Sequence, residues 1–194
     1  MNDATCISNL CTKSRSDWNA YAPNLPPGIG QTWIQDPTNK FRITIHHAGA
    51  DYSQTTDAAV VKAIQEAHQN PQGDLNSPDI AYHFLVGGYK DTTACVFYGR
   101  AISVKGAHTE LKNDGNIGIC ALGNFATTFM PQNQWNSLVN WTAKMAKDYN
   151  INPFQELKRH KDLKATTCPG NAWTDALWTQ FVKNVASVKQ VCFN

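Results

Sequence analysis

A series of short strand-like runs lies in the middle of the chain. The first, "FRITIHHA" (41–48), places Ile43 and Ile45 on one face and Thr44 and His46 on the other, which is the period of a β-strand. Three more apolar runs follow, each next to glycine-containing turns: "IAYHFLVGG" (80–88), "ACVFYGR" (94–100) and "NIGICALGNF" (116–125). These runs predict a sheet at the centre of the protein.

Helical periodicity surrounds these runs. Apolar residues spaced i, i+3, i+4 and i+7 predict helices over 56–69, 132–149 and 172–188. The first forty residues (1–40) are rich in proline and glycine and are expected to form an irregular arm packed on the rest. The chain is therefore predicted to be one α/β domain over 1–194, with a central mixed β-sheet flanked by helices.

Composition excludes several classes of protein. The net charge of +2 without a clustered basic segment predicts no nucleic-acid partner. No window approaches 18 consecutive apolar residues, so no membrane-spanning helix is expected. The N-terminal stretch lacks the charged and apolar regions of a secretory signal. We expect the chain as given to be a mature form, or one released by lysis or a signal-independent route.

The six cysteines divide into three groups. Cys120 lies inside the apolar run "IGICALG" and is predicted to be a buried thiol. Cys168 lies in a polar loop and is a candidate functional residue. The other four lie near chain ends or strand ends and could form two disulfides in three ways, which the sequence leaves open: Cys6, Cys11, Cys95 and Cys192.

Candidate chemistry lies at a strand end and in the loop "HKDLKATTCPG" (160–170). His46 and His47 end a predicted strand on opposite faces, and His160 and Cys168 lie in the loop. One of the paired histidines, with His160 and Cys168, would match the three-ligand count of a catalytic zinc site. The alternatives are a Cys168 nucleophile with His160 as its base, or a buried thiol near a surface histidine. The residues alone do not separate these hypotheses.

Other histidines and tryptophans have simpler interpretations. His68 and His83 lie beside apolar residues and are predicted to be structural. Trp33, Trp173 and Trp178 are predicted to pack in the core, because large aromatic side chains are usually buried.

Seven blocks in this order resemble one known family. The blocks are "SRSDW" (14–18), "ITIHHAGA" (43–50), "DIAYHFLVGG" (79–88), "YGR" (98–100), "GAH" (106–108), "NIGICALGNF" (116–125) and "RHKDLKATTCPG" (159–170). The resemblance as a whole covers roughly residues 14 to 182. The set resembles the zinc-dependent N-acetylmuramoyl-L-alanine amidases of type 2. Phage-type lytic amidases and animal peptidoglycan recognition proteins share this fold.

The resemblance implies roles for particular residues. His46, His160 and Cys168 correspond to the ligands of one Zn²⁺ per chain, and Tyr82 corresponds to a catalytic tyrosine. Thr166 stands where recognition-protein amidases have a threonine and phage-type enzymes a lysine, so its role as polariser of the carbonyl or as support stays open.

Two more histidines and one cysteine follow from the same comparison. His108 of "GAH" is expected either to line the substrate groove or to have a structural role. His47 is expected to lie beside the zinc ligands, in the core or on the substrate side. Another branch of the family has an aspartate ligand and a glutamate where this chain has Cys168 and Cys120. Non-catalytic members typically lack the cysteine ligand, so its presence favours an enzyme.

The implied function is hydrolysis of the amide between N-acetylmuramic acid and L-alanine in peptidoglycan stem peptides. The alternative is a recognition module that binds peptidoglycan without turnover. The expected partner is peptidoglycan, bound by a monomer without a separate wall-binding domain; the sequence indicates no inhibitor or immunity protein. Such a protein would be secreted, periplasmic or cell-wall-facing, with bacteriolytic or antimicrobial action as a lysin, toxin, wall remodeller or defence protein.

Overall fold

A six-stranded mixed sheet forms the centre of the protein. The structure is a computed structural model, and it describes residues 9–25, 36, 39–73 and 75–193. The sheet order is β1-β4-β3-β5-β2-β6, with β4 antiparallel to β3 and every other neighbouring pair parallel. The strands are β1 (Thr12–Lys13), β2 (Arg42–His47), β3 (Phe84–Val86), β4 (Val96–Tyr98), β5 (Asn116–Ala121) and β6 (Leu157–Arg159). The predicted fold class, a mixed sheet flanked by helices, is confirmed.

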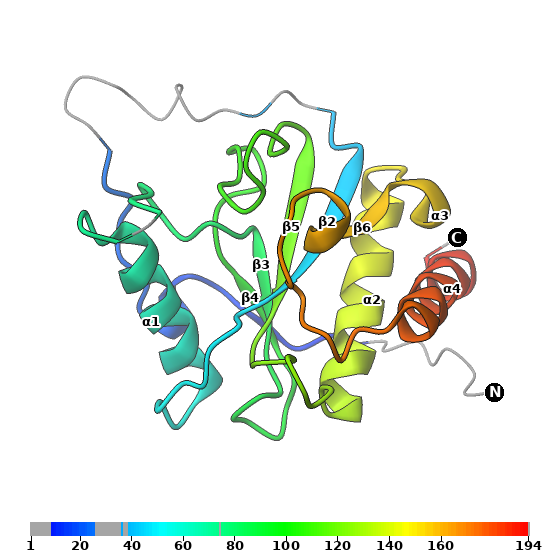
Figure 1. The fold of residues 1–194 in the computed structure, drawn as a ribbon, viewed down its shortest axis with the longest axis horizontal. Coiled ribbons are helices and arrows are strands. Elements are labelled where there is room, and N and C mark those ends of the chain that lie inside the picture. The colour runs from blue at the N-terminus through cyan, green and yellow to red at the C-terminus, as the bar shows by residue number, and fades with distance from the viewer. Residues whose placement is uncertain (1–8, 26–35, 37–38, 74, 194) are drawn as a thin grey trace.

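Helices cover both faces of this sheet (Figure 1). Helix α1 (Asp57–Gln69) packs on one face, where its apolar side chains join those of β3, β4 and β5 in one core cluster. Helix α2 (Gln132–Asp148) packs on the other face, and α4 (Asp175–Cys192) packs against α2 on the side away from the sheet. The short helix α3 (Pro153–Glu156) connects α2 to β6. Ile43 and Ile45 of β2 belong to the core cluster on the α2 side, so Thr44 and His46, which alternate with them, face the α1 side.

The first two predicted helices agree with the structure to within a residue, but the prediction for the third was wrong at both ends. The α4 helix begins at Asp175 because the hydroxyl of Thr174 accepts a hydrogen bond from the N–H of Leu177 and caps the helix. The helix then continues to Cys192, beyond the last predicted apolar position.

Two strands were missed. Within the predicted arm, Thr12–Lys13 forms β1 and pairs with β4 at the sheet edge. Just before the predicted loop 160–170, Leu157–Arg159 forms β6 beside β2. Both are three residues or shorter, too short to carry a periodic pattern.

A disulfide between Cys11 and Cys95 links the segments that carry β1 and β4. Cys120 is a fully buried free thiol, as predicted. Cys6 and Trp33 lie outside the described residues. Among the helices of the described part of the chain, none is long and apolar enough to cross a membrane.

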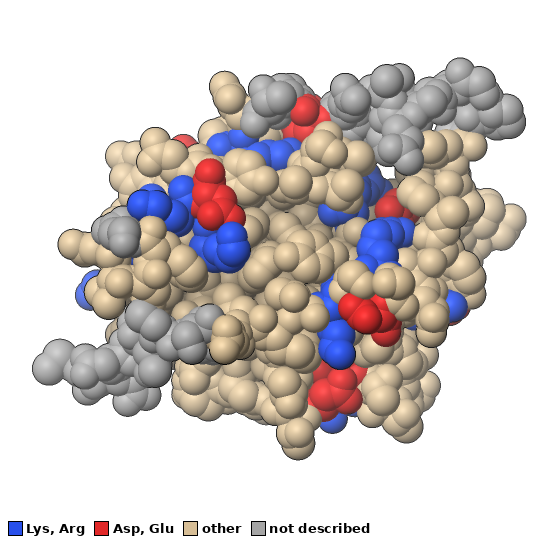
Figure 2. Space-filling model, turned by 180° about the vertical axis from the view of Figure 1, so that it is seen from behind, with Lys and Arg blue, Asp and Glu red and all other residues tan. Residues whose placement is uncertain are grey.

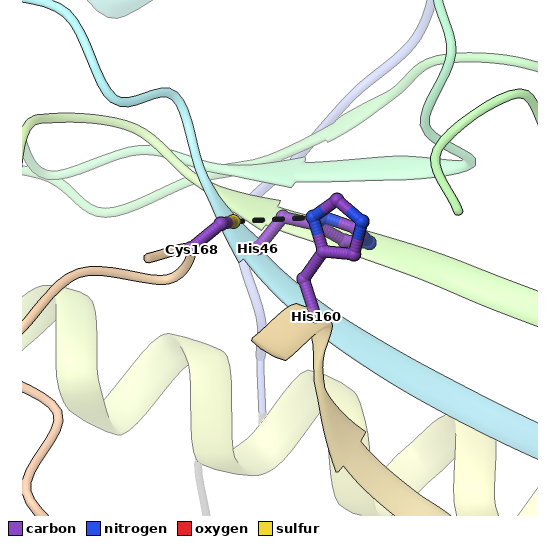
Figure 3. A group of neighbouring side chains, drawn as sticks. All are labelled: His46, His160 and Cys168. Atoms are coloured by element: carbon purple, nitrogen blue, oxygen red, sulfur yellow. Dashed lines mark hydrogen bonds between the residues drawn. The ribbon is translucent and has the colours of Figure 1, made fainter. Parts of the chain in front are cut away.

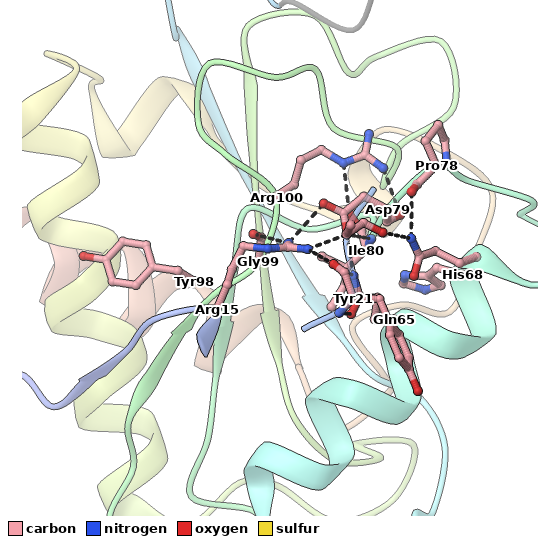
Figure 4. Close-up of polar contacts among 12 residues, drawn as sticks. Arg15, Tyr21, Gln65, His68, Pro78, Asp79, Ile80, Tyr98, Gly99 and Arg100 are labelled. Atoms are coloured by element: carbon pink, nitrogen blue, oxygen red, sulfur yellow. Dashed lines mark hydrogen bonds and ion pairs between the residues drawn. The ribbon is translucent and has the colours of Figure 1, made fainter. Parts of the chain in front are cut away.

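A group of polar side chains holds the segment just before β3 in place (Figure 4). Arg15 pairs with Asp79 at 3.0 Å, and the Asp79 carboxylate also accepts from Gln65 Nε2 at 2.7 Å and from the N–H of Ile80 at 2.8 Å. The buried Arg100 guanidinium donates to the main-chain oxygens of Asp79 and Ile80. We call Arg15, Gln65, Asp79 and Arg100 the arginine cluster. It joins the N-terminal arm, α1 and the segment before β3.

Charges are dispersed over one face of the molecule. On the face seen in Figure 2, the Lys and Arg side chains of the described residues form several separate groups with Asp and Glu among them.

Candidate metal centre

The register of two parallel strands places two histidines side by side. In the pairing of β2 with β6, Ile45 lies opposite Arg159, so the next residues along each strand are His46 and His160. Their ring centroids are 4.5 Å apart. His46 is buried on the α1 side of the sheet, whereas His160 is half-buried at the start of a short 3₁₀ helix, η3 (His160–Asp162). The missed strand β6 is therefore what assembles the pair.

The loop after η3 brings Cys168 to the same point. The N–H of Lys161 donates to the carbonyl of Cys168 at 2.9 Å, and the N–H of Cys168 donates to the Thr166 hydroxyl at 3.2 Å. Gly170 has φ +105°, and a Cβ there would lie 2.2 Å from the carbonyl oxygen of Phe125. Only glycine permits this close approach of the two chains. The loop is thereby held with the sulfur facing β2.

The three predicted ligands converge (Figure 3). One donor atom each from His46, His160 and Cys168 can be chosen so that all lie within 4.8 Å of one another. Cys168 Sγ lies 3.7 Å from His46 Nδ1. His160 Nε2 is buried and has no hydrogen-bond partner among the described residues. A buried nitrogen without a partner, in a two-histidine, one-cysteine donor set, fits a zinc ion.

Burial sets the charge state of this centre. It lowers the pKa of His46 well below 6.5 and also lowers that of His160, so both imidazoles are neutral at pH 7 and keep a lone pair for a metal. Burial raises the pKa of the Cys168 thiol to about 12, although the main-chain N–H of His47 opposes this. A reactive cysteine needs a lowered pKa. The raised pKa of Cys168 therefore argues against a thiol nucleophile. It is compatible with a metal ligand, because a divalent cation would deprotonate the sulfur.

Tyr82 lies next to the metal centre, with its ring centroid 5.1 Å from that of His46. Its carbonyl accepts from the N–H of Arg100 at 2.9 Å, which links its position to the arginine cluster. Burial raises the pKa of its phenol well above 10, and the neighbouring Cys120 and Cys168 sulfurs add to the shift. The hydroxyl therefore stays protonated and can act as a hydrogen-bond donor.

Thr166 and His47 occupy different positions around the centre. Thr166 is exposed, and its hydroxyl oxygen accepts from Cys168 while its own proton stays available for another acceptor. His47 points to the opposite face of β2 from His46, and its Nδ1 accepts from the N–H of Phe125 at 3.1 Å. Burial lowers the pKa of His47 to about 4. His47 therefore anchors the segment after β5.

His108 lies behind His46, with only 6% of its surface exposed. Its Nδ1 is 3.0 Å from His46 Nε2. This burial leaves little of the ring for a substrate and favours a structural role for His108. Sequence reasoning found the residue but missed this contact, because no spacing rule relates two positions 62 residues apart.

The remaining predicted residues have structural partners. His68 Nδ1 accepts from the N–H of Ala81 at 3.1 Å, and His83 Nδ1 accepts from the N–H of Gly118 at 3.0 Å. Trp173 is completely buried, and Trp178 is partly buried against it. These predictions are confirmed.

The sequence matches a known family over most of its length. The family described as N-acetylmuramoyl-L-alanine amidase matches residues 37–171, which include the three candidate ligands and Tyr82. The chain belongs to this family. The candidate metal centre therefore lies within the part of the chain that matches the family.

Proteins similar to this chain come from animals and bacteria. Peptidoglycan-recognition protein LB of Drosophila melanogaster is 30% identical over 160 residues, which is 81% of this chain but 63% of that protein. The structure of human PGRP-IBETAC in complex with glycosamyl muramyl pentapeptide is 25% identical with a TM-score of 0.66, covering 83% of this chain and 90% of that one. The amidase LysC of Clostridium intestinale shares the fold, with a TM-score of 0.62 at 24% identity over 84% and 93% of the two chains.

Proposed function

We propose that this chain is a zinc-dependent N-acetylmuramoyl-L-alanine amidase that hydrolyses the amide between N-acetylmuramic acid and L-alanine of peptidoglycan. The observation that carries the proposal is the convergence of His46, His160 and Cys168, whose donor atoms lie within 4.8 Å of one another. The unpartnered His160 Nε2 supports it, since a buried nitrogen that a metal does not use is costly.

The three residues would hold one zinc ion through two neutral imidazoles and one thiolate. Zinc bound there would supply a Lewis acid and lower the pKa of a water to about 7. The chain's own contribution is to keep both imidazoles neutral by burial and to hold the sulfur in place with the loop contacts of Cys168. Such a site would suit attack of the activated water on an amide carbonyl.

Tyr82 and Thr166 would stabilise the charge that develops on the carbonyl oxygen. The phenol of Tyr82 stays protonated because burial raises its pKa, so it can donate a hydrogen bond. The Thr166 hydroxyl already accepts from the N–H of Cys168, which orients its oxygen and leaves its proton to donate. One such donor is worth about 10²- to 10³-fold in rate. We assign Tyr82 as the main donor and Thr166 as a second donor that also supports the ligand loop.

The substrate and location follow from the same family. A human relative has been solved with a muramyl pentapeptide bound, which supports a peptidoglycan stem as the substrate here. The disulfide between Cys11 and Cys95 supports action in an oxidising compartment, as for a secreted, periplasmic or wall-facing protein. We propose that the chain acts there as a monomer.

The test is digestion of purified sacculi followed by mass spectrometry of the soluble products. The expected products are stem peptides with a free L-alanine amino terminus, lost after chelation and restored by added zinc. Sacculi with two types of stem peptide would also report the preference for the stem. Binding of sacculi without release of peptides, at full zinc occupancy, would instead identify a recognition module.

A further inference from the structure

We propose that His108 is a positioning residue that fixes His46 as the tautomer with hydrogen on Nε2, so that the bare Nδ1 faces the metal centre. The inference rests on the zinc site proposed above and adds a residue behind it. Metal-ligating histidines commonly donate their second N–H to a neighbouring group, which sets the tautomer and the ring orientation. Here the neighbouring group is a second histidine.

The direction of the hydrogen bonds follows from a main-chain carbonyl. His108 Nε2 lies 3.1 Å from the carbonyl oxygen of Asn116, which can only accept, so this nitrogen carries the hydrogen. The Nδ1 of the neutral His108 ring is then an acceptor. It lies 3.0 Å from His46 Nε2, which must donate to it. His46 Nδ1 is left with its lone pair, 3.7 Å from the sulfur of Cys168.

The opposite arrangement is inconsistent with these contacts. If His108 donated from Nδ1 to His46, its Nε2 lone pair would face the lone pairs of the Asn116 oxygen. The hydroxyl of Thr109 also lies 3.0 Å from His108 Nδ1, but it can rotate and serve as donor or acceptor. The carbonyl of Asn116 can only accept, so it fixes which nitrogen donates in each of these hydrogen bonds.

Two glycines make room for the His108 ring. A Cβ on Gly118 of β5 would lie 2.4 Å from His108 Cδ2, and a Cβ on Gly106 would lie 2.5 Å from the same atom. No side chain can occupy either position while the ring stays where it is. The ring therefore lies in a space that only these glycines leave open, beside the ligand strand β2.

The first experiment measures zinc affinity of the metal-free protein by competition with a chelator. His108→Leu should weaken zinc binding by about 10- to 100-fold, the usual effect of removing such a partner. His108→Asn should recover much of the affinity, because its Oδ1 stands near the former Nδ1 and can accept from His46. Gly118→Ala should act like His108→Leu. His68→Leu is the matched control: it removes another buried histidine outside this chain of hydrogen bonds, and zinc affinity should be unchanged.

The second experiment reads the tautomers by ¹⁵N NMR of the histidine rings in the metal-free wild type. His46 and His108 should both carry hydrogen on Nε2, and His108→Leu should give His46 a mixture of tautomers. A folded His108→Leu protein with wild-type zinc affinity, or a wild-type His46 with hydrogen on Nδ1, would overturn the proposal. Because neither readout involves turnover, a failure of the amidase assignment would be seen separately.

Discussion

Two buried polar clusters lie on the same side of the sheet, and they differ in whether their polar atoms are satisfied. In the arginine cluster the Asp79 carboxylate meets three donors, and Arg100 donates to Ser77 and three main-chain carbonyls. In the histidine cluster (His46, His108, His160 and Cys168), His46 and His108 bond to each other, but His160 Nε2 has no partner among the described residues. No carboxylate belongs to it.

This difference predicts a structural role for the arginine cluster and a metal-binding role for the histidine cluster. A closed network of opposite charges needs nothing else and stabilises the fold. A cluster of neutral nitrogens and a thiol, with one buried nitrogen unsatisfied, is incomplete without a cation. Removing a member of the first cluster should therefore affect stability, and removing a member of the second should affect activity.

The largest effect is expected for His160→Ala. Loss of a zinc ligand should lower kcat/KM on sacculi by about 10³-fold or more, since a catalytic metal supplies several kcal/mol of charge stabilisation. The urea midpoint of the metal-free protein should change little, because His160 Nε2 makes no hydrogen bond to the described residues. A large loss of stability in the metal-free variant would contradict the contrast between the clusters.

Tyr82→Phe should lower kcat by about 10²- to 10³-fold, because it removes one donor to the developing oxyanion. Zinc content and thermal stability should stay near wild-type values, since the aromatic ring that packs against His46 and His68 is retained. Wild-type kcat in this variant would show that Tyr82 is a packing residue only.

Asp79→Ala should lower the free energy of unfolding by about 3 kcal/mol, since it leaves Arg15 and Gln65 facing an empty space. Asp79→Asn is the matched control: it keeps an acceptor at Oδ1 but loses the charge, so its cost should be smaller. Urea unfolding measures both. Zinc bound per folded chain should be unchanged; a loss of zinc would mean that the two clusters are coupled.

The smallest effect is expected on mild acidification. Burial lowers the pKa of His68 to about 4 and of His83 to about 3, from 6.5 in the unfolded chain. Between these values the unfolded state binds more protons, so their contribution to stability is complete above pH 6.5 and is lost as the pH falls. Through each histidine, the free energy of unfolding should fall by about 1 kcal/mol between pH 6.5 and 5.5. Urea midpoints of the metal-free protein should show this, with a shallower slope in His83→Gln.

The sequence predicts the elements with long patterns and the ligands with local motifs. Strand β2 and helix α1 show clear alternation or helical spacing, and both appear where expected. The resemblance also named His46, His160 and Cys168, which the structure brings together. Spacing alone leaves the metal, thiol and core hypotheses open.

What the sequence could not predict depends on contacts between distant short segments. Strand β6 is only Leu157–Arg159, with two polar residues, yet its register with β2 places His160 beside His46. The pairing of Cys11 with Cys95 depends on the two-residue strand β1. His108 was identified through the block "GAH", but its partner could be found only in three dimensions.

The zinc content of three purified proteins tests the proposed metal centre. The wild type should bind one zinc per chain after chelation and reconstitution, and Cys168→Ser should bind none under the same conditions. Cys120→Ser, the same replacement at the other free cysteine, should still bind one, because Cys120 does not belong to the ligand set. Full zinc occupancy in Cys168→Ser, or none in the wild type, would contradict the metal centre.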